Sequence, residues 1–230
     1  MTIHTYHEPL PGVDRAEILE LWAESWRRAG WEPVVHTRAD AAKHPKAGVY
    51  DRLIAKLPTV NPRDYEEACW RRWLVAAQVG GYWCDDDLVN CRVTPELVRP
   101  QDGTGMMFTA WHEGEMPNTG LLHGTPALFE NSFLHRIWRG SVPQVEEGGR
   151  PHTSDMVLWQ SLWRLGKIHD VRGLMASYGP DLGAPLLVHC SHHHTHQAGT
   201  TQVQAMRELV RRRKRPAKPQ EPLASATSES

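Results

Sequence analysis

The sequence predicts an α/β fold in which a mostly parallel sheet is flanked by helices. A strand pattern, a helix pattern and a second strand pattern follow one another over residues 2–37, in the order of a parallel strand–helix–strand unit. Strand and helix patterns keep alternating toward residue 213, and no internal repeat interrupts them. A chain of 230 residues can bury its own core as one domain, which we place at residues 1–213.

The first three elements have clear sequence patterns. Alternating side chains predict a strand over 2–7, and a second strand is predicted over 31–37. Between them a helix is predicted over 13–30, ending at Gly30, which is a typical helix stop. Its apolar residues at helical spacing are Ile18, Leu21, Trp22 and Trp26.

The remaining elements continue the alternation. A long helix is predicted over 61–81, with Gly80 and Gly81 at its end, and a short strand or turn over 82–86 leaves it. Thr153 or Ser154 can cap a later helix. Further strands are predicted over 105–111, 119–124 and 184–190, and further helices over 125–140, 153–166 and 200–214.

The chain ends and the cysteines bear on location. Residues 214–230 start as a basic block and become rich in Pro, Ala and Ser, a composition that predicts a disordered tail. The N-terminus has neither a basic start nor an apolar middle, and no apolar run approaches the ~20 residues of a membrane span. From these two features we expect no signal peptide and no membrane span. Without a CxxC pair we expect reduced thiols, which favour the cytoplasm of a bacterium or a phage-infected host. The cysteines are Cys69, Cys84, Cys91 and Cys190.

The stretch VGGYWCDDDLVN, residues 79–90, places three aspartates directly after an apolar run. Like charges this close repel one another, so the cluster requires compensation. On an extended segment Asp85 and Asp87 point to one side and Asp86 to the other. Carboxylate oxygens suit Mg²⁺ or Mn²⁺, whereas the plainer alternative is a solvated acidic turn after a helix.

Together with Arg72 and Trp73 on the preceding helix, this stretch resembles a motif of the GT-A glycosyltransferases. The motif is an Arg-aromatic pair followed at a fixed distance by Gly-Gly-x-aromatic-x-Asp-x-Asp, and the resemblance is closest to the DXD-containing, family 32-like sugar transferases. It covers residues 69–88 closely and the first strand–helix–strand unit loosely. It implies a GT-A-like fold and metal-dependent, retaining transfer of a sugar from a UDP- or GDP-sugar donor to a hydroxyl acceptor.

The resemblance also implies roles for individual residues. Asp87 is the main metal ligand, and Asp85 contacts the metal or the sugar and ribose of the donor. Arg72 reaches the donor sugar or diphosphate, for which its rigid fork of donors is suited. Trp83 occupies the aromatic position of the motif, beside the donor. Cys69 stands where many relatives carry Asp, which leaves the donor sugar open.

Three further positions carry weaker expectations. Arg71 is expected to be a surface cation on its helix. Asn118 resembles an Asn that relatives place near the sugar. Asp155 begins a predicted helix, where the helix dipole stabilises a carboxylate. We expect it to cap this helix, and the alternative is that it faces the acceptor.

The first strand and one later strand contribute candidates for the pocket. His4 and Tyr6 lie on the first strand, whose carboxyl end borders the nucleotide in this architecture, and each either lines that pocket or packs in the core. Trp111 and His112 end a predicted strand and are candidates for an acceptor platform.

The stretch LLVHCSHHHTHQ gathers five histidines. His189 follows an apolar strand and is a candidate third metal ligand, because GT-A enzymes often take a His from a late segment. The others fall in a predicted polar loop, where one or two can contact phosphate; they are His192, His193, His194 and His196. Imidazoles also suit zinc, so a zinc site is the rival interpretation.

Two acceptors and two function classes stay open. The acceptor is a glycan or the modified bases of phage-type DNA, because the basic block at 211–215 suits an anionic polymer. The competing class is a nucleic-acid- or zinc-binding module that uses this block and the histidines.

Overall fold

The structure is a computed structural model that describes residues 1–98, 106–110, 118–165, 169–171, 175–179, 182 and 185–212. At 106–110, 118, 119 and 169–171 it describes the backbone alone. Trp111, His112 and the tail predicted over 214–230 lie outside the described residues.

The N-terminal part is the strand–helix–strand unit that the sequence predicts. Its two strands pair in parallel, and the helix between them buries Trp22 and Trp26 completely. Gly30 follows that helix with a φ of 87°, a conformation common just after a helix end. The elements are β1 (Thr2–Tyr6), α1 (Ala16–Arg27) and β2 (Glu32–His36).

The main sheet has six strands in the order β2-β1-β3-β6-β5-β9. β1 is parallel to β2 and β3, and β5 is parallel to β9, whereas β6 is antiparallel to both of its neighbours. The mostly parallel sheet is therefore confirmed, with β6 as the reversed strand. The added strands are β3 (Gly81–Cys84), β5 (Met106–Ala110), β6 (Asn118–Gly124) and β9 (His169–Val171).

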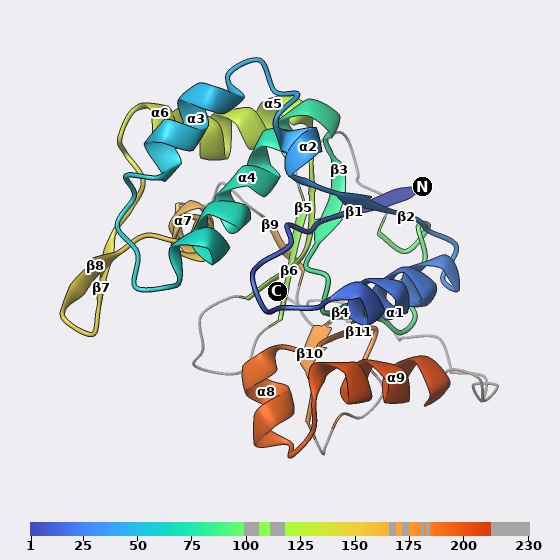
Figure 1. Cartoon of the computed structure of the whole chain (residues 1–230). Helices are drawn as coiled ribbons and strands as arrows, with labels where there is room; N and C mark the ends of the chain where they lie inside the picture. Colours follow the sequence, from blue (N-terminus) through green and yellow to red (C-terminus); the bar gives the residue numbers. More distant parts are fainter. Residues whose placement is uncertain are drawn as a thin grey trace, which may run out of the picture.

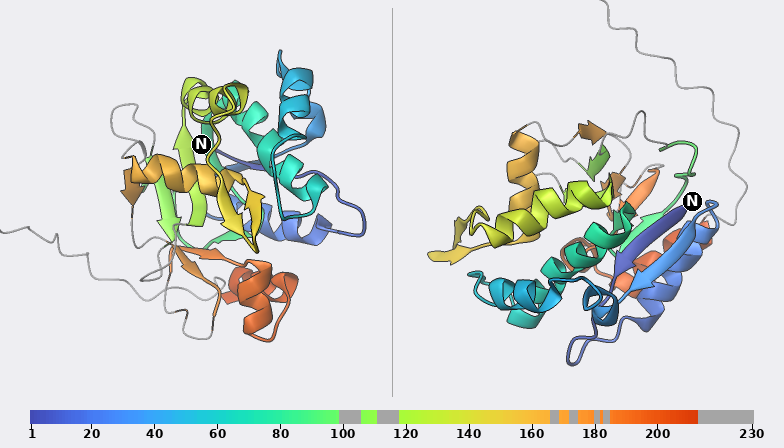
Figure 2. Two further views of the ribbon diagram at one scale, coloured as in Figure 1. Left: turned by 90° about the vertical axis from the view of Figure 1, so that its left-hand side faces the viewer. Right: turned by 90° about the horizontal axis from the view of Figure 1, so that it is seen from above.

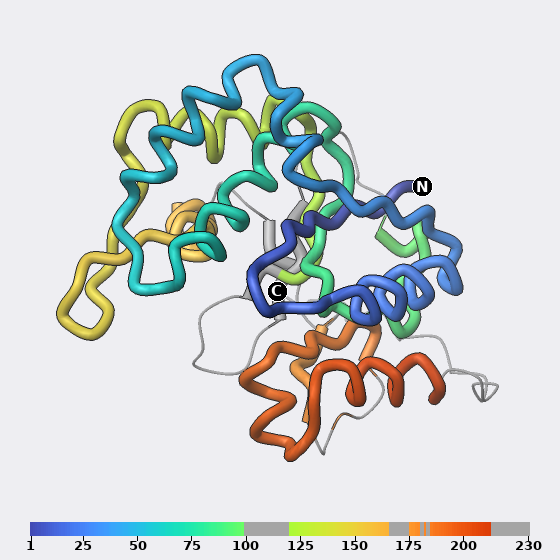
Figure 3. Tube along the Cα trace, viewed as in Figure 1, coloured from blue at the N-terminus to red at the C-terminus, as the bar shows by residue number. Residues whose placement is uncertain are grey.

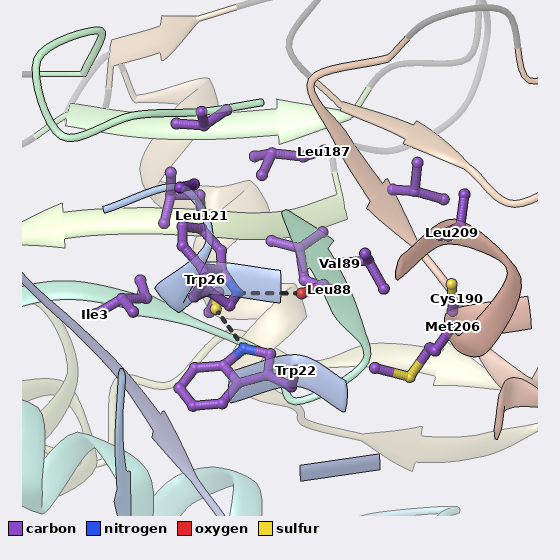
Figure 4. Close-up of a cluster of buried hydrophobic side chains, with 14 of the residues drawn as sticks. Ile3, Trp22, Trp26, Leu88, Val89, Leu121, Leu187, Cys190, Met206 and Leu209 are labelled. Atoms are coloured by element: carbon purple, nitrogen blue, oxygen red, sulfur yellow. Dashed lines mark hydrogen bonds between the residues drawn. The ribbon is translucent and has the colours of Figure 1, made fainter. Parts of the chain in front are cut away.

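Helices cover both faces of this sheet (Figure 1, Figure 2). Side chains of β3 alternate between two cores, as the period of a strand requires. Tyr82 and Cys84 join the core that contains α1 and α9, and Trp83 joins the core that contains α4. In the first core, Trp26 Nε1 donates to Leu88 O at 3.3 Å (Figure 4). The helices are α4 (Arg63–Val79), α7 (Asp155–Arg164) and α9 (Gln202–Arg212).

A second sheet of three strands, in the order β10-β11-β4, carries the C-terminal part of the chain to the aspartate run. β11 is antiparallel to β4, with His189 opposite Leu88, so His189 arrives beside the aspartates that precede β4. The chain then passes through α8 to α9, which lies beside α1 (Figure 3). These elements are β4 (Leu88–Asn90), β10 (Met175–Ser177), β11 (Leu187–His189) and α8 (His192–Gln197).

Several elements differ from the expectation. The polar loop predicted for the histidines is wrong, because residues 192–197 form α8. Ser191 Oγ caps it by accepting from the His194 amide, and a good cap outweighs the weak helix propensity of histidine. The helix expected over 125–140 contains a π-helical turn. The sequence analysis did not predict β4, β9, β10, α2 (Arg38–Ala41), α3 (Ala47–Ile54), β7 (Val145–Glu147) or β8 (Arg150–His152). The interrupted helix consists of α5 (Pro126–Phe129), a π-helical turn (Glu130–Leu134) and α6 (His135–Trp138).

The junction of α4 and β3 depends on Gly80. Its φ of 62° and ψ of −153° fall in a region used almost only by glycine. An added Cβ would lie 2.7 Å from Pro126 Cδ and 3.1 Å from Gly124 O. We expect Gly80→Ala to lower the free energy of unfolding by about 3 kcal/mol, measured by urea denaturation.

Gly140 provides the matched control. It also has a φ of 62°, but a Cβ there would meet nothing within 4 Å. Gly140→Ala should therefore cost about 1 kcal/mol, from backbone strain alone. Equal losses in the two variants would contradict the close packing at the α4–β3 junction.

Candidate active site

A cavity of about 700 Å³ lies where β1 and β3 end. Its wall combines the residues after β1, one face of α4, the aspartate run, the start of α7 and the segment from His189 to Gln202. From α4, Tyr65, Cys69 and Arg72 line it, at the spacing of one helix face. The position agrees with the rule that open α/β sheets bind ligands beyond the carboxyl ends of their strands.

Asp85, Asp87 and His189 converge at this cavity. One ligand atom from each residue can be chosen so that all lie within 4.8 Å of one another. The aspartates follow β3 and directly precede β4, and His189 is the last residue of β11. Because β4 and β11 pair with Leu88 opposite His189, the histidine lies beside the aspartates. Two carboxylates and one imidazole fit a divalent cation that prefers oxygen ligands.

The Asp87–His189 pair is electrostatically coupled. His189 Nε2 lies 3.2 Å from Asp87 Oδ1. Burial by itself lowers the pKa of His189, but the charge of Asp87 overcomes this and raises that pKa above its ordinary value. Burial likewise opposes ionisation of Asp87, yet His189 holds the pKa of Asp87 below its usual range. A proton and a metal ion compete for such an imidazole.

Asp86 does not belong to this ligand group, as the sequence predicts, but it is not a solvated side chain. Arg15 Nε and one Nη donate to its two oxygens at 2.7 and 2.6 Å. The pair lines the cavity, and the Asp86 side chain is 13% exposed. The plain alternative of a solvated acidic turn therefore does not describe this cluster.

Arg72 bridges two carboxylates in the cavity wall. One of its Nη atoms bonds Asp85 Oδ1, and the other lies 2.5 Å from Asp155 Oδ2. Trp73 Nε1 donates to the same Asp155 oxygen at 3.1 Å. Burial alone would lower the pKa of Arg72, but Asp155 and Asp85 raise it well above its ordinary value. Arg72 is thus a permanent cation facing the cavity.

Asp155 contributes to the site by a route that the sequence did not indicate. The α7 cap is Ser154, whose side chain accepts from the Val157 amide. Asp155 is 3% exposed and is the partner of Arg72. Its main contact is therefore an ion pair that orients Arg72, rather than the helix cap.

Arg71 is a correction to the sequence analysis. Instead of a surface cation, it is 6% exposed. It pairs with Glu8, Asp51 and Glu67 at 3.0, 2.9 and 2.6 Å. Because Glu8 follows β1 and Asp51 lies on α3, the buried guanidinium ties both segments to α4.

The two first-strand candidates separate. Tyr6 lines the cavity. His4 packs instead: its Nδ1 lies 2.9 Å from His36 Nε2, and its ring stacks on Trp83. Trp83 is 1% exposed, and its Nε1 donates to Gly80 O, so His4 and Trp83 lie outside the cavity wall. The Asn118 side chain is outside the described residues, although its backbone begins β6.

The remaining histidines do not assemble a second metal cluster in the described part of the chain, where the Asp85–Asp87–His189 group is the one found. His192 and His193 line the cavity, and His194 bonds Ser191. Sequence reasoning missed Arg15 and Gln202, which also line the cavity. No local sequence pattern marks them, because Arg15 precedes α1 and Gln202 begins α9, both far along the chain from the aspartate run.

Comparison with solved structures identifies the fold. The galactosyltransferase LgtC, in complex with donor and acceptor sugar analogs, aligns with a TM-score of 0.53 and 13% identity over 92% of this chain and 96% of its own. An active-site mutant of LgtC gives 0.57 and 15% over the same shares. The apo glycosyltransferase GlyE of Streptococcus pneumoniae TIGR4 gives 0.54 and 11%, and this alignment covers 91% of this chain but 59% of that structure.

In the sequence comparisons, no protein-family model and no curated protein sequence matches the chain. Identities of this size show a shared fold and nothing finer. The mixed α/β architecture is that of the GT-A glycosyltransferases, which confirms the fold class expected from the sequence. No helix among the described residues is both long and apolar enough to span a membrane.

The Arg72–Asp155 pair yields a stability prediction. Asp155→Ala removes one partner of a buried ion pair, which typically costs about 3–5 kcal/mol in the free energy of unfolding. Asp64→Ala is the matched control, because Asp64 also lies in a first helical turn but is exposed. It should cost less than about 1 kcal/mol. Equal costs in urea denaturation would show that Asp155 acts only on the helix dipole.

His4 yields a prediction on pH. Burial, and secondarily His36, lower the pKa of His4 to about 4, whereas an unfolded histidine titrates near 6.5. Between these values the unfolded chain takes up a proton that the folded chain refuses, so stability falls as pH falls from 6.5. After allowance for partial solvent exposure, we expect His4 by itself to contribute about 1–2 kcal/mol less stability at pH 5 than at pH 7.5.

The control for this pH effect is His4→Phe, which keeps a ring against Trp83 and cannot titrate. The difference in unfolding free energy between pH 7.5 and pH 5 should shrink by that amount in His4→Phe. An unchanged pH dependence would mean that His4 titrates normally in the folded chain.

Proposed function

We propose that this chain is a metal-dependent glycosyltransferase that moves a sugar from a nucleotide-sugar donor to a hydroxyl acceptor. The observation that carries the proposal is the convergence of Asp85, Asp87 and His189 beside Arg72, in a cavity at the strand ends of a GT-A fold. The solved structures with this fold include a galactosyltransferase with donor and acceptor sugar analogs.

The proposed metal ligands are Asp87, Asp85 and His189, and the ion is Mg²⁺ or Mn²⁺. A bound ion would neutralise charge that develops on the leaving diphosphate. Asp85 serves two neighbours in this arrangement, because one of its oxygens already accepts from Arg72. Arg72 thereby stays aimed at the cavity, where a guanidinium can bind donor hydroxyls or phosphate oxygens.

The other cavity residues suit the two ends of a donor. His192 and His193 lie on the wall that follows His189, where imidazole N–H groups can donate to phosphate oxygens. Tyr6 and the residues after β1 lie on the wall where this architecture places the nucleotide. A UDP- or GDP-sugar donor, retention of the anomeric configuration and the possible place of Asn118 near the sugar rest on the sequence resemblance alone.

A glycan is the acceptor that we propose. The nucleic-acid alternative depended on the basic block at 211–215, of which the described part ends at Arg212. That residue pairs with Glu208 on its own helix, and residues 213–215 of the block lie outside the described residues. The zinc alternative depended on the histidines, and His189 faces carboxylates rather than other imidazoles.

The test is a panel of UDP- and GDP-sugars scored by release of nucleoside diphosphate in the presence of Mn²⁺. A transferase without acceptor should hydrolyse a matching donor slowly, and chelation with EDTA should remove the activity. Asp87→Asn should lower the rate by about 100-fold, because it removes the charge of a ligand. Asp86→Asn should lower it less, by about ten-fold, because Asp86 lies outside the ligand group.

Two outcomes would contradict the proposal. One is the absence of Mn²⁺-dependent release from every donor in the panel. The other is an equal loss in Asp87→Asn and Asp86→Asn, which would show that the ligand assignment within the aspartate run is wrong. His189→Ala should raise the Mn²⁺ concentration needed for half-maximal release, and a wild-type titration would remove His189 from the ligand set.

A further inference from the structure

We propose that Gln202 is a positioning residue that holds the Asp87 carboxylate for a divalent cation, and that Arg15 holds Gln202 in turn. Gln202 begins α9, more than a hundred residues after the aspartate run. The inference rests on the metal centre of the proposed function and concerns how its main ligand is kept in place.

The Gln202 amide makes two short contacts at the site. Its Nε2 donates to Asp87 Oδ2 at 3.1 Å and to the Cys190 carbonyl at 3.0 Å. The Cys190 amide in turn donates to the Asp87 carbonyl at 2.9 Å. Asp87 is therefore attached through both its backbone and its side chain to the segment that carries His189.

Chemistry determines which way the amide points. The two groups facing Nε2 are a carboxylate and a carbonyl, and both accept only. The group nearest Oε1 is Arg15 Nη1, at a long 3.5 Å, and a guanidinium donates only. Reversing the amide would place an oxygen against two acceptors and an NH₂ group against a cation.

Arg15 is itself held in place. Its Nε and Nη2 bind both oxygens of Asp86 at 2.7 and 2.6 Å, which is a bidentate and geometrically specific pairing. Gln202 lies beyond this pair, so an ordered series of contacts runs from Asp86 through Arg15 and Gln202 to Asp87. The middle aspartate thereby supports its neighbour without being a ligand.

This arrangement divides the two oxygens of Asp87 between two tasks. Oδ2 accepts from Gln202, and Oδ1 faces His189 Nε2 at 3.2 Å. A carboxylate anchored by one oxygen has lost its freedom to rotate, so the other oxygen keeps its direction toward the proposed ion. Hydrogen bonds of this kind to metal-binding carboxylates typically change metal affinity by about 10–100-fold.

The backbone of Gln202 provides a rigid base. α9 packs against α1 through buried Ala205, Met206 and Leu209. Arg15 directly precedes the first residue of α1. The two residues that support Asp87 therefore lie at the starts of two packed helices, and movement of either helix would change the ligand geometry.

The experiment measures Mn²⁺ binding to the full chain without any donor, by the loss of the free-ion signal in electron paramagnetic resonance. Gln202→Met keeps the side-chain length and removes the donor, and should weaken Mn²⁺ binding by about ten-fold. Gln204→Met is the matched control. Gln204 lies in the same turn of α9 but is exposed, and its oxygen accepts from Thr200 and Thr201, so its Mn²⁺ affinity should equal that of the wild type.

The connection through Arg15 is tested with Arg15→Met alone and combined with Gln202→Met. If Arg15 acts through Gln202, the double variant should bind Mn²⁺ about as weakly as Gln202→Met, rather than at the product of the two losses. The thermal midpoint of Gln202→Met should agree with that of Gln204→Met, whereas both variants with Arg15→Met should have lower midpoints, because Asp86 loses its partner.

Three results would overturn the inference or its basis. Equal Mn²⁺ affinity in Gln202→Met and Gln204→Met would show that the amide does not support Asp87. A weaker Mn²⁺ affinity of Gln202→Met, accompanied by a lower thermal midpoint than that of Gln204→Met, would show a general loosening of α9. No Mn²⁺ binding by the wild type would instead remove the metal centre of the proposed function, and the inference with it.

Discussion

The charges of Asp85, Asp86 and Asp87 are compensated one by one, and much of the structure serves that requirement. Three adjacent carboxylates repel one another strongly when protein surrounds them. Asp85 is paired with Arg72, Asp86 with Arg15, and Asp87 with His189. Each partner comes from a different element, so the cluster can exist only where those elements meet.

The meeting point explains why the fold joins distant parts of the chain. α4 brings Arg72, the start of α1 brings Arg15, and β11 brings His189 through its pairing with β4. Arg72 also pairs with Asp155 at the start of α7, through its other Nη atom. The same side chains that make the cluster stable also line the cavity.

A site built from mutually compensated charges is suited to a charged ligand. The cavity presents fixed cations and carboxylates whose orientations are set before a ligand arrives, and preorganised charges stabilise developing charge better than mobile ones. The proposed donor diphosphate and metal ion would carry both signs, which matches the two kinds of charge in the wall. Arg71 pairs with Glu8, which lines the cavity, and with Asp51 and Glu67, and so fixes the segment after β1.

The sequence by itself determined the parallel strand–helix–strand start, the long helix that ends at two glycines, and the direction of Asp85 and Asp87, because these depend on local periodicity. Its resemblance to a known motif also indicated Arg72 and His189 as their companions. Only the tertiary structure decided the partners of each charge. Arg71 became a buried hub, Asp155 a partner of Arg72, Trp83 a core residue with His4 stacked on it, and Arg15 and Gln202 members of the site. These roles depend on contacts between residues that lie far apart in the chain, and no local pattern of residue types records which helix end will face which strand.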